Sequence, residues 1–127
     1  MKFTLPLPPS INRTYGVSRT GQHAFYKKRS AKDWEYTAGW EIIRQRGKVG
    51  AQTPLLINLT VNIVWYCRIA RDIDAGIKIL LDLLQKQSIY KNDRQVKTLH
   101  VYIIESLESK VEVEIKGWKE DNERYKN

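Results

Sequence analysis

Residues 55–66, with the sequence Leu-Leu-Ile-Asn-Leu-Thr-Val-Asn-Ile-Val-Trp-Tyr, decide the fold. Apolar and polar side chains alternate through most of this stretch, which predicts a long β-strand with one buried face. The face expected to be buried carries Ile57, Leu59, Val61, Ile63 and Trp65. Whatever packs on that face must come from the segments on either side.

The segment that follows the strand has the periodicity of an amphipathic helix. Within residues 73–87, apolar side chains recur at helical spacing, at Ile73, Ile77, Leu80, Leu81 and Leu84. Residues 88–94 are polar and predict a loop. Two further strand patterns follow, at 99–103 and 111–115, and the intervening pair Leu107-Glu108 predicts a hairpin turn between them.

The amino-terminal side of the central strand predicts a short strand and a helix. Alternation over residues 3–7 indicates the strand, and the polar, basic stretch 13–29 predicts a loose hairpin with its tip at 18–21. The helix is expected from Ser30 to Arg46, ending at Gly47. It carries two apolar stripes, listed in order as Ala31, Trp34, Ala38 and Ile42, then Tyr36, Trp40 and Ile43. A surface this wide suits either a subunit interface or core packing alone.

The order of these elements predicts the fold class. Strand, hairpin loop, helix, strand, helix, strand and strand together indicate a single α+β domain, with a mixed sheet and two helices packed on one face. We expect this domain to span residues 1–118, and residues 119–127 to form a charged tail.

Composition narrows the class of protein. The chain has 127 residues and a net charge of +8, which favours a nucleic-acid partner, although solubility alone could account for the charge. A single cysteine excludes an internal disulfide and a cysteine-rich zinc site. No apolar run is long enough to cross a membrane, and the first residues lack the core of a signal peptide. A cytoplasmic location is therefore expected.

Three acidic residues in this basic chain form the candidate site. Asp72 and Asp74 lie where the second helix is expected to begin, and Asp93 lies in the loop after it. Carboxylates without His or Cys neighbours suit Mg²⁺ or Mn²⁺, which could be held against a phosphate backbone. A helix of about fifteen residues spans roughly 22 Å, so Asp93 reaches Asp72 only if the loop doubles back.

Lys78 extends the candidate site along the helix. It lies one turn after Asp74, and Asp82 lies one turn further. A cation here could stabilise the charge that develops on a scissile phosphate. Structural alternatives stay open. Asp72 could be a helix cap and Asp93 a turn residue. The row formed by Asp74, Lys78 and Asp82 could be an exposed helix face with paired charges. Basic residues that could hold phosphates flank the acids, namely Arg68, Arg71, Lys86, Lys91, Arg94 and Lys97.

Three short motifs follow one another along the chain. Residues 5–15 contain Pro-Pro-Ser-x-Asn-x-x-Tyr, residues 71–82 contain Arg-Asp-Ile-Asp followed by Lys78 and Asp82, and residues 92–96 contain Asn-Asp-Arg-Gln-Val. Together they resemble the motifs of the RusA family of Holliday junction resolvases, endodeoxyribonucleases common in phages and prophages. Two positions differ from the family pattern: Ala75 replaces the usual Asn, and Asn92 replaces the usual first Asp of a pair.

The resemblance implies a metal-dependent endodeoxyribonuclease that resolves four-way junctions by paired hydrolysis during DNA recombination and repair, in a bacterial or phage-infected cell. It implies that Asp72, Asp74 and Asp93 are catalytic and bind Mg²⁺ (or Mn²⁺), that Lys78 is catalytic, and that the enzyme is a homodimer. A binding protein with weak or no catalysis, or a structure-specific nuclease of another class, remains the alternative. The residues expected to contact DNA are Asn12, Arg13, Arg19, Lys27, Lys28, Arg29, Arg68, Arg71, Lys91 and Arg94.

Overall fold

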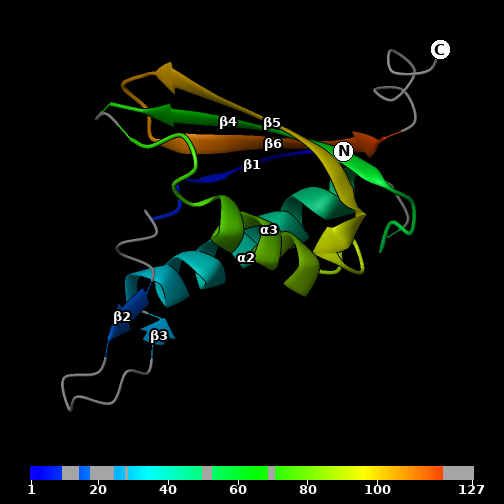
Figure 1. The fold of residues 1–127 in the computed structure, drawn as a ribbon, viewed down its shortest axis with the longest axis horizontal. Helices are drawn as coiled ribbons and strands as arrows, with labels where there is room; N and C mark the ends of the chain where they lie inside the picture. The colour runs from blue at the N-terminus through cyan, green and yellow to red at the C-terminus, as the bar shows by residue number, and fades with distance from the viewer. Residues whose placement is uncertain (10–14, 18–24, 28, 50–52, 69–70, 119–127) are drawn as a thin grey trace.

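The computed structural model describes residues 1–9, 15–17, 25–27, 29–49, 53–68 and 71–118 (Figure 1). Both long helices lie on the same face of the main sheet, which confirms the predicted α+β class. The elements in chain order are β1 (Lys2–Pro6), β2 (Tyr15–Val17), β3 (Phe25–Lys27), α2 (Arg29–Val49), β4 (Leu59–Cys67), α3 (Ile77–Lys86), the 3₁₀ helix η1 (Asp93–Gln95), β5 (Val96–Glu105) and β6 (Lys110–Gly117).

The main sheet has the strand order β1-β6-β4-β5. β4 pairs in parallel with β5 and antiparallel with β6, while β1 pairs antiparallel with β6. The predicted hairpin between the last two strands is therefore wrong, because β4 lies between them. A parallel neighbour needs a crossover, which α3 supplies, and β6 then takes the remaining side of β4. The connection from β5 to β6 passes the end of β4, where Ser106 N donates to Cys67 O at 3.0 Å.

The two short strands form a separate antiparallel ribbon. Tyr15 pairs with Lys27, and Val17 pairs with Phe25. This ribbon confirms the hairpin expected within residues 13–29, and it lies beside the start of α2, away from the main sheet (Figure 1). The expected tip at 18–21 lies outside the described residues.

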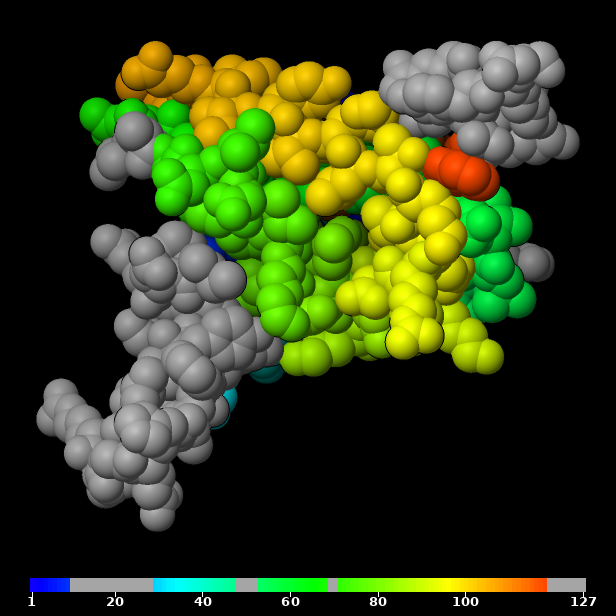
Figure 2. All heavy atoms as spheres, viewed as in Figure 1, coloured from blue at the N-terminus to red at the C-terminus, as the bar shows by residue number. Residues whose placement is uncertain are grey.

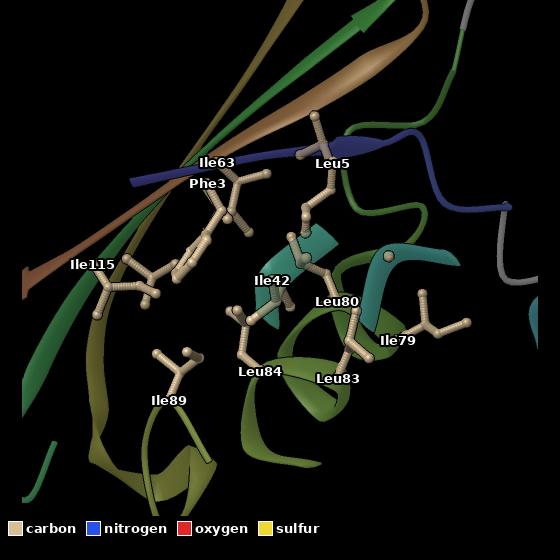
Figure 3. Close-up of a cluster of buried hydrophobic side chains, with 14 of the residues drawn as sticks. Phe3, Leu5, Ile42, Ile63, Ile79, Leu80, Leu83, Leu84, Ile89 and Ile115 are labelled. Atoms are coloured by element: carbon tan, nitrogen blue, oxygen red, sulfur yellow. The ribbon is translucent and has the colours of Figure 1, made fainter. Parts of the chain in front are cut away.

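The core fills the space between the helices and the inner face of the sheet. Phe3 and Leu5 of β1 point toward Ile42 of α2 and Leu80 of α3 (Figure 3). The inward-facing residues of β4 and β6 are also buried, namely Leu59, Val61, Ile63, Trp65, Val111, Val113 and Ile115. One stripe of α2 therefore packs in the core, as the sequence allowed, whereas Tyr36, Trp40 and Ile43 remain exposed.

Among the predicted boundaries that differ from the structure are those of α2, β4 and α3. α2 continues past Gly47 and ends at Val49. Gly47 therefore lies inside the helix, with open space around its Cα. β4 begins only at Leu59, which leaves Ile57 59% exposed. α3 begins at Ile77 because Gly76 has a φ of 94°, a left-handed conformation that a continuous helix excludes. Ile73 is consequently 52% exposed and contributes little to the expected helical stripe.

No helix in the described part of the chain is both long and apolar enough to cross a membrane.

Candidate active site

The turn that bears Asp72 and Asp74 is held from inside by Arg71. The Arg71 Nη2 donates to Ala75 O at 2.8 Å and to Pro8 O at 2.7 Å, and its Nε donates to Ala75 O at 3.2 Å. Burial lowers the pKa of Arg71, but an arginine remains charged at any physiological pH. The guanidinium thus ties the turn to the segment after β1, and charge-assisted bonds of this kind are among the stronger ones in proteins.

Trp65 holds the same turn from β4. Its indole Nε1 donates to Ile73 O at 2.7 Å. The Arg71 guanidinium also lies 5.2 Å from the centre of a Trp65 ring, at cation–π distance. The carbonyls at residues 73 and 75 are therefore both fixed, while the side chains of Asp72 and Asp74 remain exposed. The backbone that carries the two carboxylates is therefore fixed before any ligand arrives.

Gly76 makes this tight packing possible. A Cβ placed there would lie 2.7 Å from Arg71 Nη2 and 2.9 Å from Pro8 Cγ, in addition to the strain of its φ of 94°. Gly76 is also the N-cap residue of α3, and no side chain caps this end of the helix. The alternative interpretation of Asp72 as the helix cap is therefore wrong. Asp72 instead supplies its carbonyl to Ala75 N at 3.0 Å, within the turn.

Lys78 and Asp82 form an ion pair on the exposed side of α3. Their Nζ and Oδ2 atoms are 3.5 Å apart, at the i,i+4 spacing. The Lys78 side chain is 65% exposed, so this pair contributes little to stability and leaves the ammonium free to move. Both the catalytic interpretation of Lys78 and the exposed-face alternative are compatible with this geometry.

Asp93 is positioned by a second rigid segment. The Asn92 Oδ1 accepts from Arg94 N at 2.9 Å, and the Gln95 Oε1 accepts from Asn92 N at 2.9 Å, which is a capping box. Gln95 Nε2 also donates to Leu55 O at 2.8 Å. Position 92 is thus a cap, where Asn and Asp serve about equally well. This accounts structurally for Asn92 in place of the acidic residue usual in the resembled family.

The far end of α3 completes the support of Asp93. The Gln85 Oε1 accepts from Asp93 N at 3.0 Å. Tyr90 is buried nearby in the sequence, and its hydroxyl donates to Leu81 O at 2.7 Å. Burial raises the pKa of Tyr90 well above its usual range, and the negative charges of Asp93 and Asp82 raise it further. Asp93 therefore lies beside the carboxyl-terminal half of α3.

The three acids do not meet within the chain. The chain leaves β4 before Asp72 and Asp74, and it enters the parallel strand β5 directly after Asp93, so the two segments lie at opposite ends of α3 (Figure 1). The described residues include no group of three or more His, Cys, Asp or Glu side chains that could hold a metal ion. The loop after α3 does not double back toward Asp72, as a shared ion would have required.

The residues expected to bind DNA fall into three sets. Arg29, Arg68, Lys91 and Arg94 are exposed. Arg71 is half-buried and its bonds run to Pro8 and Ala75, so its structural role is holding the turn, and DNA contact by it stays a prediction. Asn12, Arg13, Arg19 and Lys28 lie outside the described residues, and Lys27 is described only as part of the β3 backbone.

The supporting residues were the part that sequence reasoning missed. Gln95 had a visible signal, because Asn followed three residues later by Gln is a capping-box pattern. Gln85, Trp65 and Pro8 had none, since each acts across a distance in sequence that only the fold brings together. Asp82 pairs with Lys78, and its negative charge also raises the pKa of Tyr90.

Comparison with known proteins identifies the family. A family model described as Endodeoxyribonuclease RusA matches residues 6–116. That range contains the clamped turn, α3 and the capped Asp93 segment. The search of curated proteins found no match. Membership implies endodeoxyribonuclease activity on Holliday junctions. With most of its length matched by this one model, the chain belongs to the RusA endodeoxyribonuclease family.

Proposed function

We propose that this protein is a metal-dependent endonuclease that resolves four-way DNA junctions by paired hydrolysis of opposed strands. The observation that carries the proposal is the turn between β4 and α3, which presents Asp72 and Asp74 from a scaffold fixed by Arg71 and Trp65. Carboxylates carried on a fixed turn can meet a cation with little further ordering of the chain. The net charge of +8 provides the complementary attraction for DNA.

The donor chemistry of the turn fits Mg²⁺ or Mn²⁺, because its exposed side-chain donors are carboxylate oxygens. Asp72 and Asp74 would hold such an ion, which when bound activates water and stabilises the leaving oxygen. Lys78, on its flexible stem, would exchange Asp82 for a substrate phosphate near the cut. Arg68, Lys91 and Arg94 would hold the phosphates of the junction arms.

Paired incision sets the number of copies. Cutting two opposed strands of one junction needs two active sites related by a twofold axis, so we propose a homodimer. Recombination and repair in the cytoplasm of a bacterial or phage-infected cell would provide the substrate. No membrane partner enters this proposal.

Cleavage of defined DNA structures tests the activity. A synthetic four-way junction, a flap and a linear duplex are compared with Mg²⁺ or Mn²⁺ at one fixed salt concentration, since phosphate-driven affinity varies steeply with salt. We expect the junction to be cut fastest, and Asp74→Asn to lower that rate by about a hundredfold or more while junction binding is retained. Asp33→Asn, an exposed acid on α2, is the matched control and should cut normally. Normal cutting by Asp74→Asn would remove the assigned role.

A second candidate, a junction-binding protein without catalysis, is favoured by one observation. The three carboxylates are not gathered in one protomer. Calorimetric titration with Mn²⁺ separates the two candidates, because a binding protein has no reason to take up the ion at Asp72 and Asp74. Junction binding with neither ion uptake nor cutting would select this second candidate.

A further inference from the structure

The connection between β5 and β6 presents an apolar side chain from a fixed backbone. Ser106 N donates to Cys67 O at 3.0 Å, and the Ser106 hydroxyl accepts from Glu108 N at 3.1 Å. Lys110 Nζ lies 3.2 Å from Glu108 Oε2. In this turn the Leu107 side chain is 84% exposed, more than any other large apolar side chain among the described residues. A single exposed leucine is ordinary on a protein surface, so its surroundings decide whether it has a role.

A surface hollow beside Leu107 provides such surroundings. The hollow has a volume of about 440 Å³ and is lined by Arg68, Glu105, Ser106 and Leu107. This volume falls within the range of ligand-binding clefts in proteins, about 300–1,000 Å³. The lining combines one apolar side chain with a guanidinium, a carboxylate and a hydroxyl. Because the hollow opens to solvent, it suits one group of a large ligand better than a whole small molecule.

The hollow lies at the same end of the main sheet as the acidic turn. Arg68 directly follows β4, and the bond from Ser106 N to Cys67 O brings the β5–β6 connection to the end of that strand. From Arg68 the chain continues to the turn that bears Asp72 and Asp74. Figure 2 shows the β5–β6 connection (orange) and this turn (green) on the same side of the molecule, as does the ribbon in Figure 1. A DNA strand held at the acidic turn would therefore have its neighbouring nucleotides close to the hollow.

The lining fits a nucleobase better than a phosphate group. The Glu105 carboxylate repels a phosphate, whereas a base is uncharged and its edge can offer an amino group to a carboxylate. Leucine is one of the apolar side chains that proteins insert between base steps to unstack them. A guanidinium, here that of Arg68, can stack on a base or hold the phosphate next to it. The net charge of +8 makes DNA the ligand that this surface attracts.

We propose that the hollow is a base-binding subsite, in which a base from the branch point of the DNA substrate leaves its stack and packs against Leu107, while Arg68 holds the adjoining phosphate. The inference deepens the proposed function and rests on it, because it concerns how the same nuclease selects its substrate.

The subsite favours branched DNA over linear duplex. Unstacking a base costs free energy, and the cost is least where pairing or stacking is already interrupted. The stack is interrupted at the branch point of a junction and is continuous in a linear duplex. Leu107 is therefore a specificity-determining residue that takes no part in the hydrolysis itself.

Fluorescence of a modified base tests the unstacking. In a synthetic four-way junction, 2-aminopurine, which brightens when it leaves the base stack, replaces one branch-point base at a time. The full-length protein is added in EDTA, so that no strand is cut. We expect at least one of these positions to brighten with the wild type, and Leu107→Ser to abolish the rise. Leu107→Met keeps the apolar volume and should retain it. Leu56→Ser is the matched control, because Leu56 is 74% exposed but does not line the hollow.

Binding constants test the preference for branched DNA. By fluorescence anisotropy, Leu107→Ser should bind the junction roughly tenfold more weakly than the wild type, as expected for the loss of one base contact. It should bind linear duplex as tightly as the wild type. The salt dependence of its binding should not change, because leucine neutralises no phosphate, whereas Arg68→Gln should make that dependence shallower.

Several results would overturn the subsite. They are no brightening at any branch-point base, junction binding by Leu107→Ser that equals the wild type, an equal loss on linear duplex, and an equal loss in Leu56→Ser. Sedimentation equilibrium of Leu107→Ser tests another occupant. A change in its oligomeric state would assign the hollow to a contact between protein chains, and the base-binding role would fail.

The subsite and the nuclease function fail in different ways. A wild type that unstacks a branch-point base but does not cut with Mg²⁺ would support the subsite and count against the nuclease function. A wild type that cuts junctions without unstacking any of these bases would overturn the subsite and leave the nuclease function standing.

Discussion

The acidic residues at the two ends of α3 are held in place by different kinds of contact. At its start, Asp72 and Asp74 lie on a turn held by a buried cation and an indole, which are long-range contacts to β4 and to the segment after β1. At its far end, Asp93 is held mainly by a capping box within four residues. In addition, Asp93 N donates to Gln85 Oε1, and Gln95 Nε2 donates to Leu55 O. A long-range clamp depends on the whole fold, whereas a capping box depends on local sequence. Variants at the two ends should therefore differ in how far they lower the free energy of unfolding.

Arg71→Met should have the largest effect on stability. Methionine retains an apolar stem over Trp65 but removes the donors to Pro8 O and Ala75 O, both in a partly buried setting. Bonds from charged donors contribute about 1.5–3 kcal/mol each, so we expect a loss of about 3 kcal/mol in the free energy of unfolding. Urea denaturation measures the loss. A variant within 1 kcal/mol of the wild type would mean that the turn does not depend on this clamp.

The second largest effect is expected at Gly76. In Gly76→Ala the new Cβ meets Arg71 Nη2 and Pro8 Cγ, and a left-handed residue costs about 1–2 kcal/mol for alanine. We expect a loss of about 2 kcal/mol or more, read from the same denaturation curves. Gly47→Ala is the matched control: its Cβ meets nothing within 4 Å inside α2, so it should stabilise the protein by roughly 0.5–1 kcal/mol. Equal effects at the two glycines would contradict the packing described at Gly76.

The fold and the candidate site differ in how much of each could be predicted from the sequence. The α+β class, the buried stripe of α2 and the alternation of β4 follow from local periodicity, which short-range patterns record well. The swap of β6 and β5 around β4 was missed, because strand order depends on the crossover and not on either strand alone. The start of α3 at Ile77 was missed because Gly76 was not recognised as a helix boundary. The prediction of one metal site for all three acids required that they meet within the chain, and the fold places them at opposite ends of α3.

At the other end of α3, Gln95→Met should have a smaller effect. It removes the bonds to Leu55 O and Ile57 O and the acceptor for Asn92 N, most of them exposed to water. We expect a loss of about 1–2 kcal/mol, less than that of Arg71→Met. Asn92→Asp restores the acid that the family usually has there and keeps the cap, so it should change stability by about 0.5 kcal/mol or less. If Gln95→Met costs more than Arg71→Met, the distinction between local and long-range support is wrong.

Among the variants that remove hydrogen bonds, Tyr90→Phe should lose the least stability at neutral pH, and it should have a distinct effect in alkali. The hydroxyl donates to Leu81 O at 2.7 Å, so its loss should cost about 1 kcal/mol. Burial first, and then Asp93 and Asp82, raise the pKa of Tyr90 above that of an unfolded tyrosine, which is about 10. The folded state therefore holds the phenolic proton more tightly, so stability is unaffected below about pH 10 and falls as the pH rises beyond it. Phenylalanine has no such proton, so the variant's stability should decline less steeply between about pH 10 and 12. The free energy of unfolding of both proteins is measured by urea denaturation across that range. If the two pH dependences are parallel, Tyr90 ionises as readily in the folded state as in the unfolded one, and burial, Asp93 and Asp82 do not raise its pKa.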